Sequence, residues 1–250
     1  MAVTIKSPRE IELMRKAGEI LAQVHEELHA AVHPGMSSLD IDKLGERLIR
    51  SHGCIPSFKN YNGYPASICV SVNDEIVHGI PNKHRILKDG DIINVDVSTI
   101  LDGYFSDSSR MFCIGEVSPE KEKLVRVTKE CVELGLEQVK PWTPIGNMGS
   151  AVHKHAVENG YSVVREIGGH GVGVEFHEDP WVSFVSEENT GVLMVPGMMF
   201  TIEPMINEGS PDFFVDEDND WTVYTIDDGL SAQIEYMVLV KEDGVEVLTK

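Results

Sequence analysis

Apolar residues recur with a helical period in two stretches near the start of the chain. The first stretch begins at Ser7 and ends before Pro34, and Ser7 with Glu10 has the spacing of a capping box. The second stretch covers residues 38–52 and is followed by Gly53, the residue type that most often ends a helix. This pattern predicts two consecutive amphipathic helices.

The same order of elements returns in the second half of the chain. Ser118 and the proline after it open a third predicted helix that runs to about Val139, and a shorter fourth helix ends at Asn159. Strand-like apolar runs follow both helix pairs, at residues 67–73, 92–99 and 104–114 and then at 162–167, 198–203, 221–226 and 231–240. We therefore predict an α+β fold in which one unit occurs twice, as a single domain over residues 1–250 with halves of about 1–115 and 116–250.

The overall charge narrows the classes of partner. The net charge is −20 at 42% hydrophobic content, which argues against nucleic acid or an anionic membrane surface as a partner. The four cysteines form no C-x-x-C pair, so they indicate a reducing compartment. The first residues lack the basic and apolar regions of a secretion signal, and no run approaches the roughly 20 apolar residues of a membrane span. We therefore expect a cytoplasmic protein.

Two aspartates fall on neighbouring strands of a predicted hairpin. The Asp-Gly pair at Asp102 separates two apolar runs, which is typical of a two-residue hairpin turn. With that turn, Ser98 lies opposite Asp107, and Asp96 lies one diagonal away on the same face, within about 7–8 Å. Like carboxylates this close repel each other unless they share a proton or a cation. A solvated strand face is the alternative explanation for this pair taken alone.

Three further residues extend this candidate site. His170 lies in a segment with four glycines, and Glu203 and Glu235 each interrupt an apolar, strand-like run. A phosphate-binding glycine loop is excluded because the strand–GxGxxG–helix context is missing. Together with Asp96 and Asp107, these residues offer four carboxylates and one imidazole. That donor set suits Mn, Co, Fe(II) or Zn, and shared carboxylates suit a pair of ions about 3.5–4 Å apart.

A second histidine motif suggests a different metal site. His25, Glu26 and His29 match H-E-x-x-H, the pattern of mononuclear zinc proteases, on the first predicted helix. The two histidines flank the apolar stripe of that helix, and the longer form of the motif is interrupted because Val32 replaces its glycine. We therefore interpret this segment as an ordinary surface helix.

Considered together, these segments resemble the type I methionine aminopeptidases over essentially the whole chain. The resemblance rests on Asn94-Val95-Asp96, Asp107, His170-Gly171-Val172-Gly173, His177, Phe200-Thr201-Ile202-Glu203-Pro204-Met205, Ser231-Ala232-Gln233-Ile234-Glu235, and residues 69–75 and 77–81. It implies the pita-bread fold, whose two α+β halves agree with the repeat. It also implies that Asp96, Asp107, His170, Glu203 and Glu235 bind two divalent metal ions, with Asp107 and Glu235 bridging them.

The resemblance assigns roles to further residues. A metal-bound hydroxide is expected to attack the first peptide bond, with Glu203 moving its proton, His177 stabilising the oxyanion and His78 supporting the amide nitrogen. His78 and His177 thus also contact substrate. The methionine side chain is expected in a pocket whose aromatic and sulfur lining suits a thioether. That pocket would consist of Phe58, Tyr61, Tyr64, Cys69, Phe176 and Trp221.

The expected function is removal of the initiator methionine from nascent proteins whose second residue is small. The expected partners are nascent polypeptide N-termini, with the ribosome as a candidate docking partner, and the expected state is a monomer. One alternative is a prolidase or Xaa-Pro aminopeptidase, which shares the fold and a similar ligand set but usually carries an extra N-terminal domain. Another is a catalytically inactive binding protein on the same scaffold, although five intact ligand-type residues argue against it.

Overall fold

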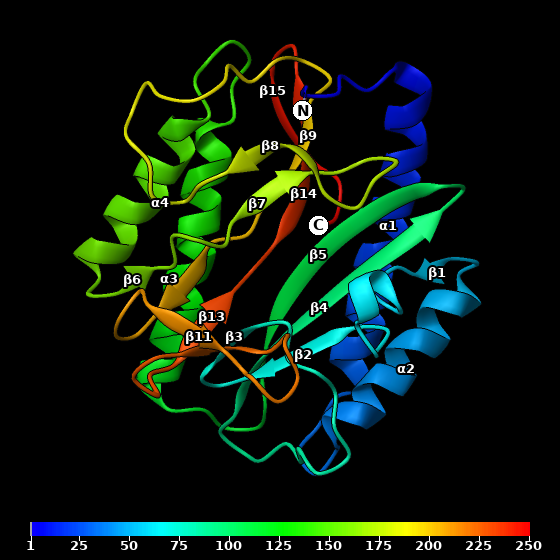
Figure 1. Ribbon diagram of the computed structural model, residues 1–250, viewed down its shortest axis with the longest axis vertical. Coiled ribbons are helices and arrows are strands. Elements are labelled where there is room, and N and C mark those ends of the chain that lie inside the picture. The colour runs from blue at the N-terminus through cyan, green and yellow to red at the C-terminus, as the bar shows by residue number, and fades with distance from the viewer. Residues whose placement is uncertain (1) are drawn as a thin grey trace.

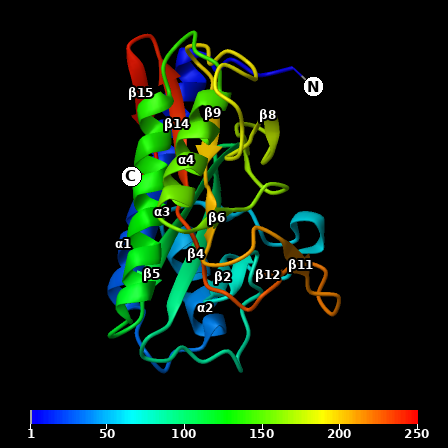
Figure 2. The same ribbon diagram turned by 90° about the vertical axis from the view of Figure 1, so that its left-hand side faces the viewer.

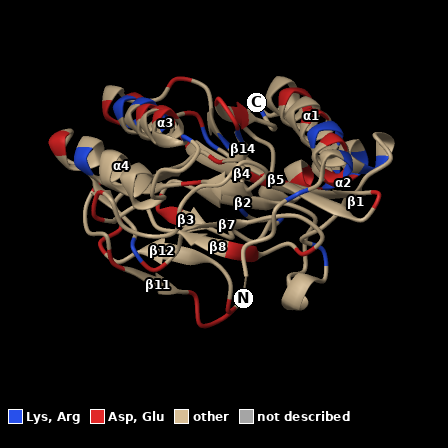
Figure 3. Ribbon diagram, turned by 90° about the horizontal axis from the view of Figure 1, so that it is seen from above, with Lys and Arg blue, Asp and Glu red and all other residues tan. Residues whose placement is uncertain are grey.

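Two helix pairs lie along one face of a set of twisted strands in the computed structural model, which describes residues 2–250 (Figure 1). The first pair is α1 (Pro8–Ala31) with α2 (Ser38–Ser51), and the second is α3 (Pro119–Gln138) with α4 (Gly146–Glu158). Seen from the side, the strands β8, β11 and β12 lie on the face opposite the helices (Figure 2). Seen from above, the two pairs stand at either side of the central strands (Figure 3). The predicted α+β architecture is confirmed.

The helices begin where their capping residues predict. The Ser7 side chain accepts a hydrogen bond from the Glu10 backbone N–H, and the Glu10 carboxylate accepts one from Ser7 N–H at 2.7 Å. Ser37 and Asp40 repeat this reciprocal arrangement at the start of α2. Each box satisfies backbone donors that the first helical turn leaves unpaired.

Fifteen strands form four sheets within residues 2–250. The first two sheets have the orders β1-β4-β2, with β5 beside β4, and β13-β10-β6; the others have the orders β11-β12-β3 and β15-β14-β9-β7-β8. Their bounds are β1 (Ile55–Pro56), β2 (Cys69–Val72), β3 (Glu75–Val77), β4 (Ile92–Leu101), β5 (Tyr104–Cys113), β6 (Ser162–Val163), β7 (Gly169–Gly171), β8 (Glu178–Val182), β9 (Met199–Ile202), β10 (Met205–Asn207), β11 (Phe213–Val215), β12 (Val223–Thr225), β13 (Ser231–Gln233), β14 (Tyr236–Lys241) and β15 (Gly244–Val247).

One predicted strand is divided in the structure. The run at residues 231–240 forms β13 and β14, which pair with different neighbours, β10 and β9. Between them, the Glu235 N–H donates to the Ser109 carbonyl oxygen at 3.1 Å, so the chain passes from one sheet to the next at this residue. The run at 162–167 is also shorter than predicted, since only Ser162–Val163 is paired as a strand.

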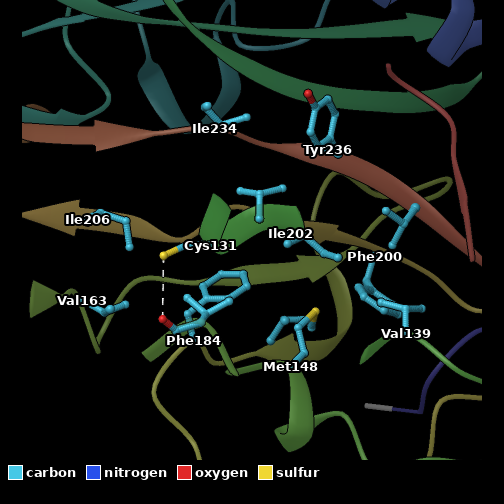
Figure 4. Packing of buried hydrophobic residues seen from close by; sticks show 14 of the residues in the cluster. Cys131, Val139, Met148, Val163, Phe184, Phe200, Ile202, Ile206, Ile234 and Tyr236 are labelled. Atoms are coloured by element: carbon cyan, nitrogen blue, oxygen red, sulfur yellow. Dashed lines mark hydrogen bonds between the residues drawn. The ribbon is translucent and has the colours of Figure 1, made fainter. Parts of the chain in front are cut away.

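One large apolar cluster lies in the first half of the chain, another lies mostly in the second half, and a smaller cluster joins the halves. In the second half, α3 and α4 pack against β9, β10 and β14 through residues such as Met148, Phe200 and Ile206 (Figure 4). A smaller cluster unites Met14 of α1 with Met237 of β14, far apart in sequence. Strands β9 and β14 are therefore held in place by packed side chains from the helices. Among residues 2–250, every helix is too short or too polar to span a bilayer.

Candidate metal and substrate site

The β4–β5 hairpin brings two aspartates to one face, as predicted. Asp102 and Gly103 form the turn with φ of +50° and +87°, which only a few residue types adopt readily. The register pairs Ser98 with Asp107, so that Asp96 projects from the same side. Both carboxylates are buried, with 8% and 4% of the residue exposed for Asp96 and Asp107.

Three strands of the second half supply the remaining ligand-type residues. His170 lies in the middle of β7, Glu203 follows the end of β9, and Glu235 lies at the break between β13 and β14. The Nε2 atom of His170 is 3.5 Å from Asp107 Oδ2 and 3.7 Å from Glu203 Oε1. Potential ligand atoms of Asp107, His170 and Glu235 all lie within 4.8 Å of one another. The structure therefore brings the sequence-predicted residues of both halves to one place.

Burial changes the acidity of all four carboxyl groups. Removal from water raises the pKa of Asp107 to about 8 and that of Glu203 to about 8. It raises the pKa of Asp96 and Glu235 well above the usual range, and the nearby charge of Asp107 raises both further. A group of like charges in a buried site is stable only with protons or cations to balance it.

Several ligand-type atoms at this site have no hydrogen-bond partner in the described residues. Asp96 Oδ1, Asp107 Oδ1 and Glu235 Oε1 are buried and unpaired. By contrast, Glu203 accepts hydrogen bonds from Thr201 Oγ1 at 2.6 Å and from Gln233 Nε2 at 3.0 Å.

The His170 ring is oriented to present one nitrogen to the carboxylates. Its Nδ1 lies 2.9 Å from the Gly171 carbonyl oxygen, an acceptor, so Nδ1 carries the proton and Nε2 offers a lone pair. One free imidazole nitrogen and several unpaired carboxylate oxygens are the donors that divalent transition metals prefer. The residues therefore fit a divalent metal centre.

A cavity of about 500 Å³ opens onto these carboxylates. It is lined by every residue that the sequence assigned to substrate: Phe58, Tyr61, Tyr64, Cys69, His78, Phe176, His177 and Trp221. Phe176 stacks on Phe105 with ring centroids 5.2 Å apart and packs against Phe58 at 5.3 Å. The lining is thus aromatic and closely packed. The Cys69 thiol is buried in the same cluster, beside Phe58 and Phe176.

Some lining residues were not predicted. Asn62, Glu178, Asp179 and Trp181 also face the cavity. The last three lie within four positions after His177, and this proximity to a predicted catalytic residue is the one signal that could have identified them.

Two neutral histidines stand beside the carboxylates. The pKa of His177 is lowered by burial in the cavity and by the neighbouring His170 and His78, and burial alone lowers the pKa of His78 to about 4. The Tyr61 hydroxyl lies 2.8 Å from Nδ1 of His177, and a hydroxyl that donates there leaves the ring proton on Nε2. His78 has φ of +59°, a conformation that is costly for a non-glycine residue. Both rings can thus donate a hydrogen bond without carrying a charge.

The H-E-x-x-H segment on α1 does not form a metal site. His25 is buried with 3% exposure, so the expectation of a surface position is wrong for this residue. Its Nε2 lies 3.0 Å from the Ser108 carbonyl oxygen, and burial lowers its pKa to about 3. The His29 ring instead packs edge-on against Phe112. The His25 side of α1 therefore faces the β4–β5 hairpin, where its ring contacts Ser108 of β5.

The chain is similar to proteins of one family along nearly its full length. Residues 12–242 match the profile of Metallopeptidase family M24. Methionine aminopeptidase A from Synechocystis sp. is 48% identical over 247 residues, covering 99% of this chain and 97% of that protein. The crystal structure of methionine aminopeptidase from Rickettsia prowazekii superposes with a TM-score of 0.98 at 39% identity, covering 100% of both chains.

A proline-specific relative is more distant. X-Pro aminopeptidase from Thermotoga maritima superposes with a TM-score of 0.76 at 25% identity, covering 98% of this chain and 62% of that one. The pita-bread fold is shared by both kinds of enzyme, whereas the sequence identity favours the first. The chain therefore belongs to metallopeptidase family M24, within its methionine aminopeptidases.

Proposed function

We propose that this chain releases the N-terminal methionine from nascent polypeptides whose second residue is small. The observation that carries the proposal is the convergence of buried, unpaired carboxylate oxygens and His170 Nε2 at one end of an aromatic cavity. The relatives named methionine aminopeptidase support methionine as the residue that the cavity accepts.

The metal ligands in this proposal are the five residues Asp96, Asp107, His170, Glu203 and Glu235. We propose that they hold two divalent ions, drawn from Co, Mn, Fe(II) and Zn. Such ions, when bound, lower the pKa of water and polarise a carbonyl group. Unpaired oxygens on residues from both halves of the chain support this assignment, because a cation would satisfy them.

The protein's own side chains then supply proton transfer and binding. Glu203, fixed by Thr201 and Gln233, accepts a proton from the attacking water and returns it to the leaving amine. His177 donates a hydrogen bond from Nε2 to the oxygen on which charge develops, while Tyr61 holds its other nitrogen. His78 supports the amide nitrogen of the scissile bond.

The substrate side chain binds among the aromatic residues. Phe176 and Tyr64 form two sides of the cavity, and the buried Cys69 thiol lies beside them. Methionine is flexible and polarisable, so it fills an aromatic cavity with favourable sulfur–ring contacts. Phe58, Tyr61 and Trp221 complete this substrate-binding set.

The test is the identity of the amino acid released from short peptides by metal-reconstituted protein. Peptides beginning Met-Ala, Met-Lys, Leu-Ala and Ala-Pro, and an N-acetylated Met-Ala peptide, form the panel. We expect free methionine from the free Met-Ala peptide alone. Release from Ala-Pro would instead indicate an Xaa-Pro enzyme, and no release with any of the four metals would indicate a binding protein.

The setting of the activity is part of the same proposal. We propose a single catalytic domain with pseudo-symmetric halves at about residues 1–115 and 116–250, acting as a monomer in the cytoplasm. Contact with the ribosome would use the surface of this domain. Supporting this organisation, the apolar cluster of Met14 and Met237 packs elements of the two halves against each other.

A further inference from the structure

A lysine near the start of the chain is buried although it carries a charge. The Lys6 side chain has 2% of its surface exposed, and its backbone N–H donates to the Gly197 carbonyl oxygen at 2.9 Å. Its ammonium group lies 2.5 Å from Glu178 Oε2, whose side chain is 10% exposed. A buried ion pair is retained at a desolvation cost, so its position calls for an explanation.

The partner of Lys6 holds the turn that carries the catalytic histidine. The second oxygen of Glu178, Oε1, accepts hydrogen bonds from the N–H groups of Val174 at 3.0 Å and Glu175 at 3.2 Å. His177 lies in this turn, directly before Glu178. One carboxylate therefore joins the ammonium of Lys6 to the backbone that sets the direction of the His177 ring.

The backbone of this turn is fitted closely to the ion pair. A Cβ atom added to Gly173 would lie 2.3 Å from Lys6 Nζ and 2.6 Å from Glu178 Oε1. The glycine N–H also donates to the Glu175 carbonyl oxygen at 3.2 Å, which closes the turn on itself. A side chain at residue 173 would therefore collide with both members of the ion pair.

We propose that Lys6 is a positioning residue for catalysis, acting through Glu178 to fix the turn of residues 173–178 and thereby the orientation of His177. This inference rests on the proposed function of His177. Without the ammonium, Glu178 is a buried carboxylate at the edge of the cavity and turns toward water, releasing Val174 and Glu175. Phe176 keeps its place because its ring packs against Phe58 and Phe105, so substrate binding changes little.

The test compares Lys6→Met with the parent enzyme. We expect kcat to fall about 10- to 100-fold, the range seen when residues supporting a catalytic group are lost, with KM changed less than about threefold. Metal content is expected to be unchanged. In a His177→Ala background, Lys6→Met is expected to have no further effect on kcat, because the residue it positions is already absent.

Two further measurements separate positioning from a general loss of stability. Amide hydrogen exchange at Val174 and Glu175 is expected to increase in Lys6→Met and to stay unchanged in Arg15→Met. The latter is a control, because it breaks the Arg15–Glu246 ion pair, a different link between the start of the chain and its second half, at 2.6 Å. Lys6→Met/Glu178→Gln, which keeps an oxygen to accept both N–H groups, is expected to recover most of kcat.

Specific outcomes would overturn this role. One is a loss of kcat from Lys6→Met that is equally large in the parent and in the His177→Ala background. The other is unchanged amide hydrogen exchange at Val174 and Glu175 in Lys6→Met. If Lys6→Met does not fold, Glu178→Ala removes the same link from its other end, and the same loss of kcat and the same increase in exchange are expected from it. A parent enzyme that releases no methionine would refute the proposed function. The link from Lys6 through Glu178 to the turn could still be tested, because hydrogen exchange is measured without activity.

Discussion

The buried carboxylates make a specific prediction about the metal-free protein: its stability falls as the pH rises from 7 to 8. Asp107 and Glu203 have pKa values of about 8 in the folded chain, against about 4 in an unfolded chain. Between pH 4 and 8 the folded protein therefore retains protons that the unfolded protein has released, so its stability falls as the pH rises through this range and levels off above pH 8.

The magnitude follows from the two pKa values. Each group loses about 1 kcal/mol of its contribution between pH 7 and 8, so the pair loses about 2 kcal/mol. Asp96 and Glu235 act in the same direction, since burial raises their pKa as well, so about 2 kcal/mol is the smallest loss expected. The three histidines with lowered pKa values gain only about 0.4 kcal/mol together over this interval, because an unfolded histidine is already mostly neutral at pH 7.

The assay is thermal unfolding of chelator-treated protein at the two pH values. A loss of about 2 kcal/mol corresponds to a fall in Tm of about 4–8 °C for a chain of this size. Asp107→Asn is expected to reduce this loss by about 1 kcal/mol, whereas Asp243→Asn, at an exposed position, serves as the matched control. If the metal-free parent is as stable at pH 8 as at pH 7, or more stable, the buried carboxyl groups do not have raised pKa values.

Three further predictions concern single residues. His177→Ala is expected to lower kcat by about 10²- to 10³-fold while metal content, measured by elemental analysis, stays the same; loss of metal would contradict its role. Gly18→Ala is expected to destabilise the protein by about 1–3 kcal/mol in urea unfolding, although alanine favours helices, because its Cβ would lie 2.2 Å from the Leu248 carbonyl oxygen. His25→Ala is expected to lower stability by about 2 kcal/mol or more with kcat unchanged, since it opens a buried space and removes a partner of Ser108; a lost metal ion would revive the zinc interpretation.

The local elements could be predicted from sequence because their signals are local. The Ser7–Glu10 capping box and the Asp-Gly turn each depend on residues within a few positions of one another. The register of Ser98 with Asp107 followed from the turn alone. The acidic ligand-type residues were found for a similar reason, because an acidic residue within an apolar run is unusual whatever the run packs against.

The structural features that the sequence did not indicate depend on contacts between residues far apart in the chain. The break at Glu235 arises because β13 and β14 pair with different strands, and no local signal marks that change. His25 is buried only because β5 lies against that side of α1 and supplies the Ser108 carbonyl. The pairing of Lys6 with Glu178 spans 172 positions, so neither residue stands out in its own segment.

If the buried carboxylates hold the catalytic metal ions, methionine release depends on added metal. Metal-free protein would be titrated with Mn, Co, Fe(II) or Zn while free methionine is measured from a Met-Ala peptide, beside Glu203→Gln treated in the same way. We expect no release without metal, a rise that saturates as the site fills, and no comparable rise in the variant. Undiminished release by the metal-free parent, or by Glu203→Gln, would contradict a metal-dependent aminopeptidase built on these carboxylates.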